Sequence, residues 1–226
     1  MPKTKNPKSS ATADGIDLHM KLAPAQDRAR TTIEQIIQAT ADLLGEVGIE
    51  RISTNLVCER AGITPPALYR YFPNKYAILH EMGRRLMEAE DAIVFRWLES
   101  GSGDRDTSIE QQIARQVELG RALRQVALSQ PGGVWILRVM RSVPTLREVR
   151  AESTRVVIEA IYQRLRSVWP KVDAARLRAA ATLSTNLSTA TNEMILDEPE
   201  LEDDVSREFA RMIALYYADL LGPMPR

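Results

Sequence analysis

Apolar side chains recur at helical spacing along most of the 226-residue chain, and no stretch alternates in the way typical of a strand. Proline and glycine separate successive helical stretches, as at Pro144, at Pro199 and in the run Pro131-Gly132-Gly133. The spacing therefore predicts an all-α protein of about nine helices. Because 44% of the residues are hydrophobic and 27% are charged, which is ordinary for a globular protein, we expect the chain to fold.

Charge, cysteine content and hydropathy exclude several classes of protein. The 30 basic residues balance the 30 acidic ones, so no net field indicates a polyanionic partner. The single cysteine, Cys58, leaves no intramolecular disulfide and is expected to be a small buried hydrophobe. No stretch approaches the roughly 20 consecutive apolar residues of a membrane span, and the first residues lack the apolar core of a secretory signal. We expect a cytoplasmic protein without a membrane partner.

Two short helices are predicted on either side of a turn at Gly62. Ser53 can begin the first helix, and Gly62 can end it in the left-handed conformation. Thr64 can begin the second, whose first positions tolerate prolines. Such a pair is a helix-turn-helix, in which the leading residues of the second helix approach base edges in the major groove. The leading residues here are Thr64, Pro65, Pro66 and Ala67.

Those leading side chains are small, apolar or singly hydroxylated, so they suit thymine methyl groups better than guanine. Asn55 and the shape of the DNA are therefore expected to contribute to readout. Hydroxyl and ammonium groups around the tip are expected to donate to phosphates, and they belong to Ser53, Thr54, Tyr69, Tyr71 and Lys75. Taken alone, the two tyrosines would suit half-buried packing positions equally well.

The segment from Thr31 to about Leu86 resembles the DNA-binding domain of the TetR family of bacterial repressors. The resemblance is carried by Ile52-Ser53-Thr54, by Ala61-Gly62-Ile63-Thr64 and by Ala67-Leu68-Tyr69-Arg70-Tyr71-Phe72-Pro73-Asn74-Lys75. It implies that operator DNA is touched by Thr54, Asn55, Pro65, Pro66, Ala67, Tyr69, Tyr71 and Lys75. The chain departs from the family in two places: some members have histidine at the position of Tyr71, and the Pro65-Pro66 pair removes two backbone donors from the tip.

The resemblance also implies an organisation for the whole chain. Residues 1–28 are polar and are expected to form a flexible arm. Residues 29–76 would form a three-helix DNA-binding domain, and residues 77–226 a helical domain for effector binding and dimerisation. The apolar residues of the last two helices would otherwise remain exposed, so we expect a homodimer there and a palindromic operator of double-stranded DNA.

Trp135 and Asn186 are the candidate residues of an effector pocket, because a tryptophan and a buried amide suit the wall of a small-molecule site. The run of Ser, Thr and Asn over residues 184–192 has an alternative interpretation, in which it lets two helices approach closely at the dimer seam.

The sequence thus predicts a DNA-binding transcriptional regulator, and specifically a repressor that a small-molecule effector releases from its operator. An orphan regulator or activator without a small-molecule ligand is the alternative. No enzyme is expected, since no cluster of titratable groups marks a cleft. His19 and His80 have no partners at metal-binding spacing, so neither a metal nor a cofactor is expected.

Overall fold

The computed structural model describes residues 12–13, 16–21, 27–101 and 108–222. Within these ranges the chain forms nine α-helices, which confirms the predicted all-α class. The helices are α1 (Asp27–Arg51), α2 (Thr54–Ala61), α3 (Pro65–Tyr69), α4 (Lys75–Glu99), α5 (Ile109–Ser129), α6 (Gly133–Ser142), α7 (Pro144–Val168), α8 (Ala174–Asp197) and α9 (Glu202–Leu221), with a 3-10 turn, η1 (Pro199–Leu201), before α9.

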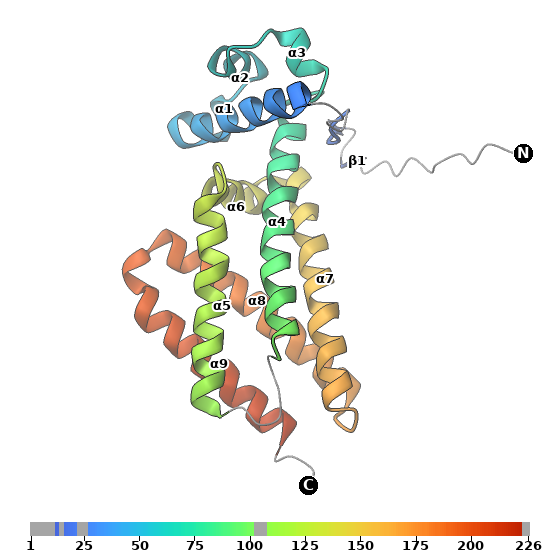
Figure 1. Cartoon of the computed structure of the whole chain (residues 1–226), viewed down its shortest axis with the longest axis vertical. Coiled ribbons are helices and arrows are strands. Elements are labelled where there is room, and N and C mark those ends of the chain that lie inside the picture. Colours follow the sequence, from blue (N-terminus) through green and yellow to red (C-terminus); the bar gives the residue numbers. More distant parts are fainter. Residues whose placement is uncertain (1–11, 14–15, 22–26, 102–107, 223–226) are drawn as a thin grey trace, which may run out of the picture.

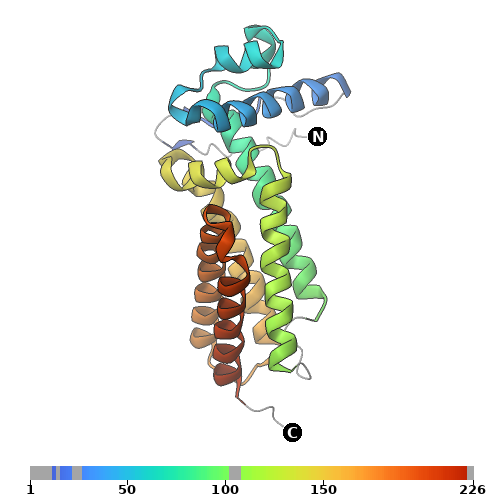
Figure 2. The ribbon, with the colours of Figure 1, turned by 90° about the vertical axis from the view of Figure 1, so that its left-hand side faces the viewer.

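The helices form two stacked parts of unequal size (Figure 1). Helices α1, α2 and α3 lie together at one end of the molecule, and α4 runs from them down into a bundle with α5, α7, α8 and α9. The short helix α6 crosses the top of the bundle and contacts α1, α4, α5 and α7. The view turned by 90° shows α8 and α9 side by side along one face of the bundle (Figure 2). None of the helices in the described ranges has the length and apolar character that crossing a membrane requires.

One small pairing of strands was not predicted. Residues Thr12–Ala13 (β1) and Ile16–Asp17 (β2) pair antiparallel, with Thr12 opposite Asp17 and Ala13 opposite Ile16. Two residues a strand make a local turn and not a layer, so the all-α description holds for the described part of the chain.

Helix α1 extends from Asp27 to Arg51 and has a break near its end. Gly48 has a φ of 72°, a left-handed conformation that interrupts regular helix there. The chain then turns into α2.

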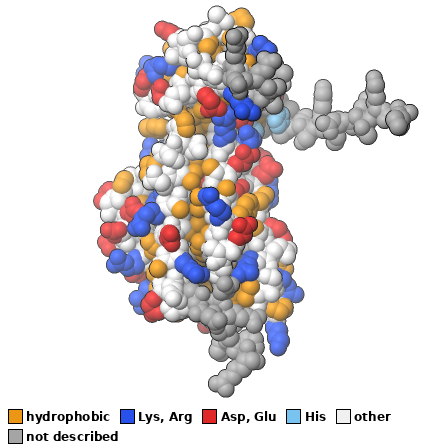
Figure 3. All heavy atoms as spheres, in the orientation of Figure 1, with side chains coloured by type: hydrophobic (Ala, Val, Ile, Leu, Met, Phe, Trp, Pro, Cys, Tyr) orange, Lys and Arg blue, Asp and Glu red, His pale blue; other side chains and the backbone are white. Residues whose placement is uncertain are grey.

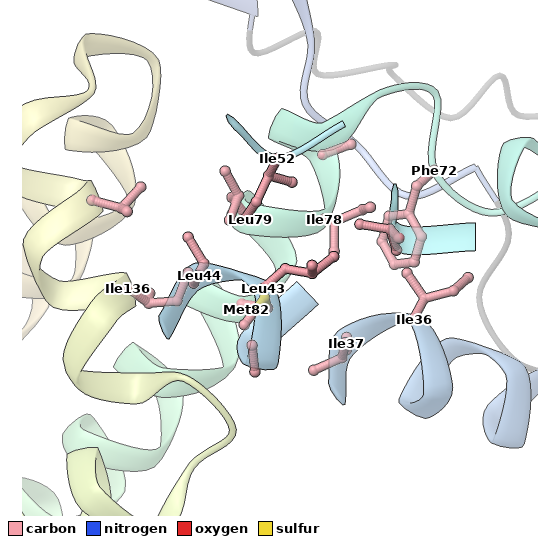
Figure 4. Close-up of a cluster of buried hydrophobic side chains, with 14 of the residues drawn as sticks. Ile36, Ile37, Leu43, Leu44, Ile52, Phe72, Ile78, Leu79, Met82 and Ile136 are labelled. Atoms are coloured by element: carbon pink, nitrogen blue, oxygen red, sulfur yellow. The ribbon is translucent and has the colours of Figure 1, made fainter. Parts of the chain in front are cut away.

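A single buried cluster joins the end formed by α1, α2 and α3 to the top of the bundle (Figure 4). Isoleucines and leucines of α1 meet Ile78, Leu79 and Met82 of α4 and Phe72, which follows α3, while Ile136 of α6 packs beside Leu44. A second cluster, centred on Leu177, lies among α7, α8 and α9 at the far end of the bundle. The first cluster includes residues on both sides of the predicted domain boundary after residue 76, such as Phe72 and Ala77, so the core is continuous there. The boundary itself stays a prediction.

Candidate DNA-binding site and ligand cavity

Local hydrogen bonds of the backbone and of Ser53 fix α2 and the turn that leads to α3. The Ser53 side chain accepts a hydrogen bond from the Leu56 N–H at 3.2 Å and so begins α2. Gly62 ends α2 with a φ of 65°, and the Ile63 N–H donates to the Cys58 carbonyl at 3.0 Å. Thr64 precedes α3 in an extended conformation, and Pro65 and Pro66 occupy its first turn. Ser53 and Gly62 thus cap α2 as predicted, whereas Thr64 holds the position before α3 without a capping hydrogen bond from its side chain.

One face of α3 is fixed in the core and the other is free. Leu68 and Phe72 are fully buried against Val57 and Cys58 of the same cluster. The side chains of Thr64, Pro65, Pro66, Tyr69 and Arg70 are exposed, and Ala67 is half-buried. Helix α3 therefore presents its leading end at the extremity of the molecule (Figure 1).

A hydrogen bond joins the two helices of the motif at their outer surface. The Thr54 hydroxyl and the Tyr69 hydroxyl lie 2.9 Å apart. Asn55 is exposed beside them at the start of α2, and Ser53 is exposed although its hydroxyl already caps the helix. The predicted residues of the tip, from both helices, thus lie on one surface.

Two predicted phosphate-contacting residues are placed differently from the rest. Tyr71 is only 6% exposed and belongs to the hydrophobic core, which favours the packing alternative for this tyrosine. The Lys75 ammonium donates to the carbonyls of Ile49 and Ile52, both at 3.0 Å. The amine therefore caps the end of α1. Contact of Tyr71 or Lys75 with DNA stays a prediction.

Arg70 was missed by the sequence reasoning. It is exposed at the end of α3, with its guanidinium 5.8 Å from the centre of the Tyr71 ring. Its place between two tyrosines of the recognised motif was the signal that would have pointed to it. It adds a positive charge next to Tyr69.

Part of the segment predicted to be a flexible arm is docked onto the DNA-binding end. The Asn74 amide donates to the Asp17 carbonyl at 2.9 Å, and the Lys21 N–H donates to the Tyr71 carbonyl at 2.8 Å. Leu18 is buried, and the His19 ring lies edge-on to the His80 ring with the centres 5.8 Å apart. Residues 16–21 are thus not a free arm. Residues 1–11, 14–15 and 22–26 lie outside the described residues.

A cavity of about 480 Å³ lies in the bundle, within the size range of small-molecule sites. Helices α4, α5, α7, α8 and α9 contribute its walls, which are mainly apolar and include Trp97, Trp169 and Tyr217. Burial raises the pKa of Tyr217 to about 12, although its hydroxyl shares a hydrogen bond of 2.9 Å with Ser184. On the side of the bundle seen in Figure 3, apolar side chains show along the middle between charged borders.

Charged side chains also line the cavity, namely Glu90, Asp91, Arg115, Arg124, Arg150, Arg164 and Glu193. Arg124 is buried and donates to Asn192 at 2.7 Å, to Glu202 at 2.8 Å and to Ser206 at 3.3 Å. Arg150 pairs with Glu193 at 3.0 Å. Burial raises the pKa of Glu90 to about 7, only partly offset by the nearby charge of Arg150.

Neither candidate pocket residue lines this cavity, so that prediction is wrong. Trp135 lies on the outer side of α6, 40% exposed, with the Arg138 guanidinium 4.8 Å from its ring centre. Asn186 is exposed on α8, and its amide donates to the Thr182 carbonyl at 2.8 Å. The residue types were reasonable for a pocket, but the packing of the bundle decides which face of each helix is turned inward.

No group of three or more His, Cys, Asp or Glu side chains suited to a metal ion occurs in the described ranges. His19 and His80 do approach each other, which their separation in the sequence did not suggest. Cys58 is buried, as expected, and burial raises the pKa of its thiol. A raised pKa keeps the thiol protonated and unreactive near neutral pH.

The free leading end of α3, the Gly62 turn and the supporting α2 define a helix-turn-helix DNA-binding protein. The sequence pattern described as "Bacterial regulatory proteins, tetR family" matches residues 36–82, which cover most of α1 and all of α2 and α3. Over 52 residues the chain is 40% identical to the class A tetracycline repressor of transposon 1721 from Escherichia coli, covering 23% of this chain and 24% of that protein. The chain spans about a quarter of the length of the tetracycline repressors that it matches.

Other relatives extend over more of the chain. An uncharacterized HTH-type transcriptional regulator of Mycobacterium bovis is 27% identical over 183 residues, which cover 78% of this chain and 88% of that one. The structure of SmeT, the repressor of a multidrug efflux pump of Stenotrophomonas maltophilia, superposes with a TM-score of 0.60 at 20% identity, covering 87% of this chain and 93% of SmeT. This likeness extends the shared fold through the bundle. Residues 36–82 thus resemble the tetR family of bacterial regulatory proteins, and the fold of the helical bundle resembles that of SmeT.

Proposed function

We propose that the protein is a homodimeric repressor that binds a palindromic operator and is released from it by a small-molecule effector. Its place of action is the cytoplasm, where bacterial DNA lies. Residues 29–76 are assigned to DNA binding and residues 77–226 to dimerisation and effector binding. The observation that carries DNA recognition is the exposed leading end of α3, which Leu68 and Phe72 anchor in the core.

The residues of the outer surface divide into two roles in this proposal, and all are exposed except Thr54 and Ala67, which are half-buried. Thr64, Pro65, Pro66 and Ala67 meet base edges, with Asn55 beside them, because they form the leading end of the recognition helix. Ser53, Thr54 and Tyr69 contact phosphates. The bond between the Thr54 and Tyr69 hydroxyls uses one of their two protons, so the hydroxyl that accepts in this bond is the one that donates to a phosphate. Arg70 is added to the phosphate-binding set as an exposed cation of the same surface.

An exposed apolar surface on the last two helices supports the proposed dimer. Helices α8 and α9 lie side by side along one face of the bundle (Figure 2). They expose six large apolar side chains, namely Leu183, Leu187, Met194, Met212, Leu215 and Tyr216. We call these six residues the α8–α9 face. A second copy of the chain is the natural cover for it, because two copies related by a two-fold axis bury the same surface on each other and place both recognition helices on one side.

The cavity and α4 support release by an effector. Met87, Glu90 and Val94 of α4 line the cavity, while Ala77, Ile78 and Leu79 at its other end belong to the core under the recognition helix. A ligand that binds better to a dimer with displaced α4 helices would lower operator affinity by that difference. Among the relatives, two proteins are tetracycline repressors, and SmeT has been crystallised with triclosan.

Selection of bound duplexes from random DNA tests the DNA-binding half of the proposal. We expect a palindrome whose half-sites are about 34–36 Å apart. Tyr69→Phe removes one phosphate donor and should lower the affinity for all duplexes alike, whereas Pro66→Ala should change the preferred bases. The absence of any preferred duplex, or equal effects of the two substitutions on sequence preference, would contradict the proposed roles.

Titration of the operator complex with candidate ligands tests the effector half. A ligand that raises the melting temperature of the free protein should also release the operator, since binding stabilises the state to which it binds. If operator binding is sound and no stabilising ligand affects it, the orphan regulator without a ligand replaces the ligand-responsive repressor.

A further inference from the structure

The charged groups that line the cavity fall into two sets, those that already have partners and one that does not. Arg115 on α5 donates to the Gly101 carbonyl at 3.2 Å, and Arg164 on α7 is not free either. Arg124 on α5 is satisfied by Asn192, Glu202 and Ser206. Arg150 on α7 pairs with Glu193 on α8 at 3.0 Å, and Arg141 of α6 reaches the same carboxylate at 3.1 Å. The positive charges of Arg124 and Arg150 are therefore matched by carboxylates of the protein itself.

Asp91, the neighbour of Glu90 on α4, is also satisfied. Its carboxylate accepts a hydrogen bond from the Ser153 hydroxyl of α7 at 2.7 Å. Glu90 is different, because within the described ranges it makes neither a hydrogen bond nor an ion pair although it lines the cavity. A carboxyl group removed from water without a partner is unfavourable as an anion, and a cation beside it would remove that penalty.

The remaining walls suit a large apolar or aromatic body. Trp97 of α4, Trp169 after α7 and Tyr217 of α9 all line the cavity, and between them stand leucine, isoleucine and valine side chains. Faces of tryptophan and tyrosine attract organic cations as well as apolar groups. Apolar walls with a single unpaired carboxyl group therefore favour a ligand that is largely apolar and carries a positive charge.

We infer that the effector site takes an amphipathic organic cation, with Glu90 as its counter-ion and the aromatic walls around its apolar body. The inference rests on the proposed function, of which it names the ligand class. An anionic ligand would find Arg124 and Arg150 already paired with carboxylates and would lie against Glu90, with only Arg115 and Arg164 of the lining to attract it. A neutral ligand could offer the Glu90 carboxyl group a hydrogen bond but no charge to stabilise its ionised form.

Protons compete with such a ligand. Burial raises the pKa of Glu90 to about 7, and the surrounding charges are Asp91 on α4, Arg150 on α7, Glu193 on α8 and the paired Arg124 on α5. The cation needs the ionised carboxylate, so its affinity is low when Glu90 is protonated. Affinity should therefore rise with pH through about 7 and become constant above it, with a limiting slope of about tenfold per pH unit on the acid side.

Two ions of nearly the same shape and opposite charge make a sharp test, namely tetraphenylphosphonium and tetraphenylborate. Neither ion titrates, so any pH dependence of binding comes from the protein. We expect the full-length protein to bind the cation at least about tenfold more tightly than the anion at pH 8. Quenching of tryptophan fluorescence and calorimetry both report the binding.

The substitution Glu90→Gln keeps the shape of the side chain and removes the charge. It should lower the affinity for tetraphenylphosphonium by about tenfold or more and abolish the pH dependence of that affinity. The affinity for tetraphenylborate should be unchanged or higher. Glu99→Gln, an exposed position on the same helix, is the matched control and should alter nothing. Thermal unfolding checks that each variant is folded.

Equal affinity for the two ions, or a Glu90→Gln variant that binds the cation as tightly as the parent, overturns the inference. Operator binding by the same preparations is measured separately. If the cation binds through Glu90 but does not change the affinity for the operator, the ligand class stands and the effector-release part of the proposed function fails. If neither ion binds while operator binding is intact, the ligand class falls and DNA recognition stands.

Discussion

Lys75 illustrates how a residue that fits a binding motif can also serve the fold. Its ammonium group donates to the carbonyls of Ile49 and Ile52, which lie just after the break at Gly48 and would otherwise lack helical partners. Two charge-assisted hydrogen bonds at a partly buried site contribute to stability whether or not DNA is present. The same amine is near the surface that the motif assigns to phosphate.

The substitution Lys75→Met should therefore lower the free energy of unfolding by about 1–3 kcal/mol, because two carbonyls lose their donor. Urea unfolding should show a lower midpoint with an unchanged slope. Lys171→Met, at an exposed position between α7 and α8, serves as the control and should stay within about 0.5 kcal/mol of the parent. If Lys75 has only this structural role, the salt dependence of operator binding is unchanged, whereas a lost phosphate contact would reduce the slope by about 0.9 per subunit.

Gly62 carries the backbone conformation on which the two short helices depend. Its φ is 65°, and a Cβ added there would meet no atom within 4 Å. The cost of Gly62→Ala is therefore conformational and not steric contact, and we expect a loss of stability of about 1–2 kcal/mol. Gly62→Asn should lose less, since asparagine tolerates the left-handed region. Equal urea midpoints for the parent and the alanine variant would contradict this explanation.

The sequence predicted those features of the helices that depend on residues close together along the chain. The caps Ser53 and Gly62 are local features, so their effect on the backbone followed from residue type alone. The apolar spacing likewise predicted nine helices, because one face of each helix had to be buried.

Features that depend on contacts between distant elements were not predicted. The docking of residues 16–21 rests on Asn74 and Tyr71, fifty or more positions away, and the apolar residues Ile16, Leu18 and Met20 of this segment did not identify its partner. The inward faces of the bundle were also beyond reach, because a helix with apolar residues on more than one side can pack in several orientations. Trp135 and Asn186 were selected by residue type, whereas packing placed Glu90, Trp97 and Trp169 at the cavity.

Helices α1 and α4 are joined by an ion-pair network that continues the hydrophobic contact between them. Glu81 is buried on α4 and accepts hydrogen bonds from Arg84 and Arg85, both at 2.8 Å, and Arg85 also donates to Glu34 of α1 at 2.7 Å. Burial alone would raise the pKa of Glu81, but the two guanidinium groups outweigh it and the pKa is lowered. The ionised form is therefore stabilised in the folded protein.

The network makes stability depend on pH in a direction that can be stated. Because the folded pKa of Glu81 lies below its ordinary value of 4.5, its contribution is fully present above that value and is lost as the pH falls through the lower folded pKa. Glu81→Gln should cost about 1–3 kcal/mol at pH 7, and the difference from the parent should shrink as the pH approaches the folded pKa. Urea unfolding at several pH values measures this. An exposed carboxylate of α5, tested as Glu118→Gln, should show no such effect.

At the scale of the whole molecule, the proposed function depends on how two copies are held. A single recognition helix offers few base contacts, whereas a two-fold dimer presents two of them, about 34–36 Å apart, to successive major grooves. The α8–α9 face is at the side of the bundle and the recognition helix at its end, with α4 running between the two regions (Figures 1 and 2). A ligand in the cavity would thus lie between the dimer contact and the DNA-binding end.

The α8–α9 face can be tested with a single charge. Leu187 of α8 and Met212 of α9 are 40% and 56% exposed in one chain, so a glutamate at either position should leave the isolated chain folded. In a two-fold dimer each substitution occurs twice in the same apolar contact, and burying carboxylates there costs several kcal/mol for each. We therefore expect Leu187→Glu and Met212→Glu to sediment with the mass of one chain, 25.4 kDa, where the parent shows twice that mass. Operator affinity should fall with the loss of the dimer.

Leu56→Glu places the same charge on an exposed leucine of α2, at the far end of the molecule, and should leave the mass unchanged. A glutamate variant of the α8–α9 face that keeps the parental mass at equal concentration would move the dimer contact to another surface, and with it the spacing of the recognition helices.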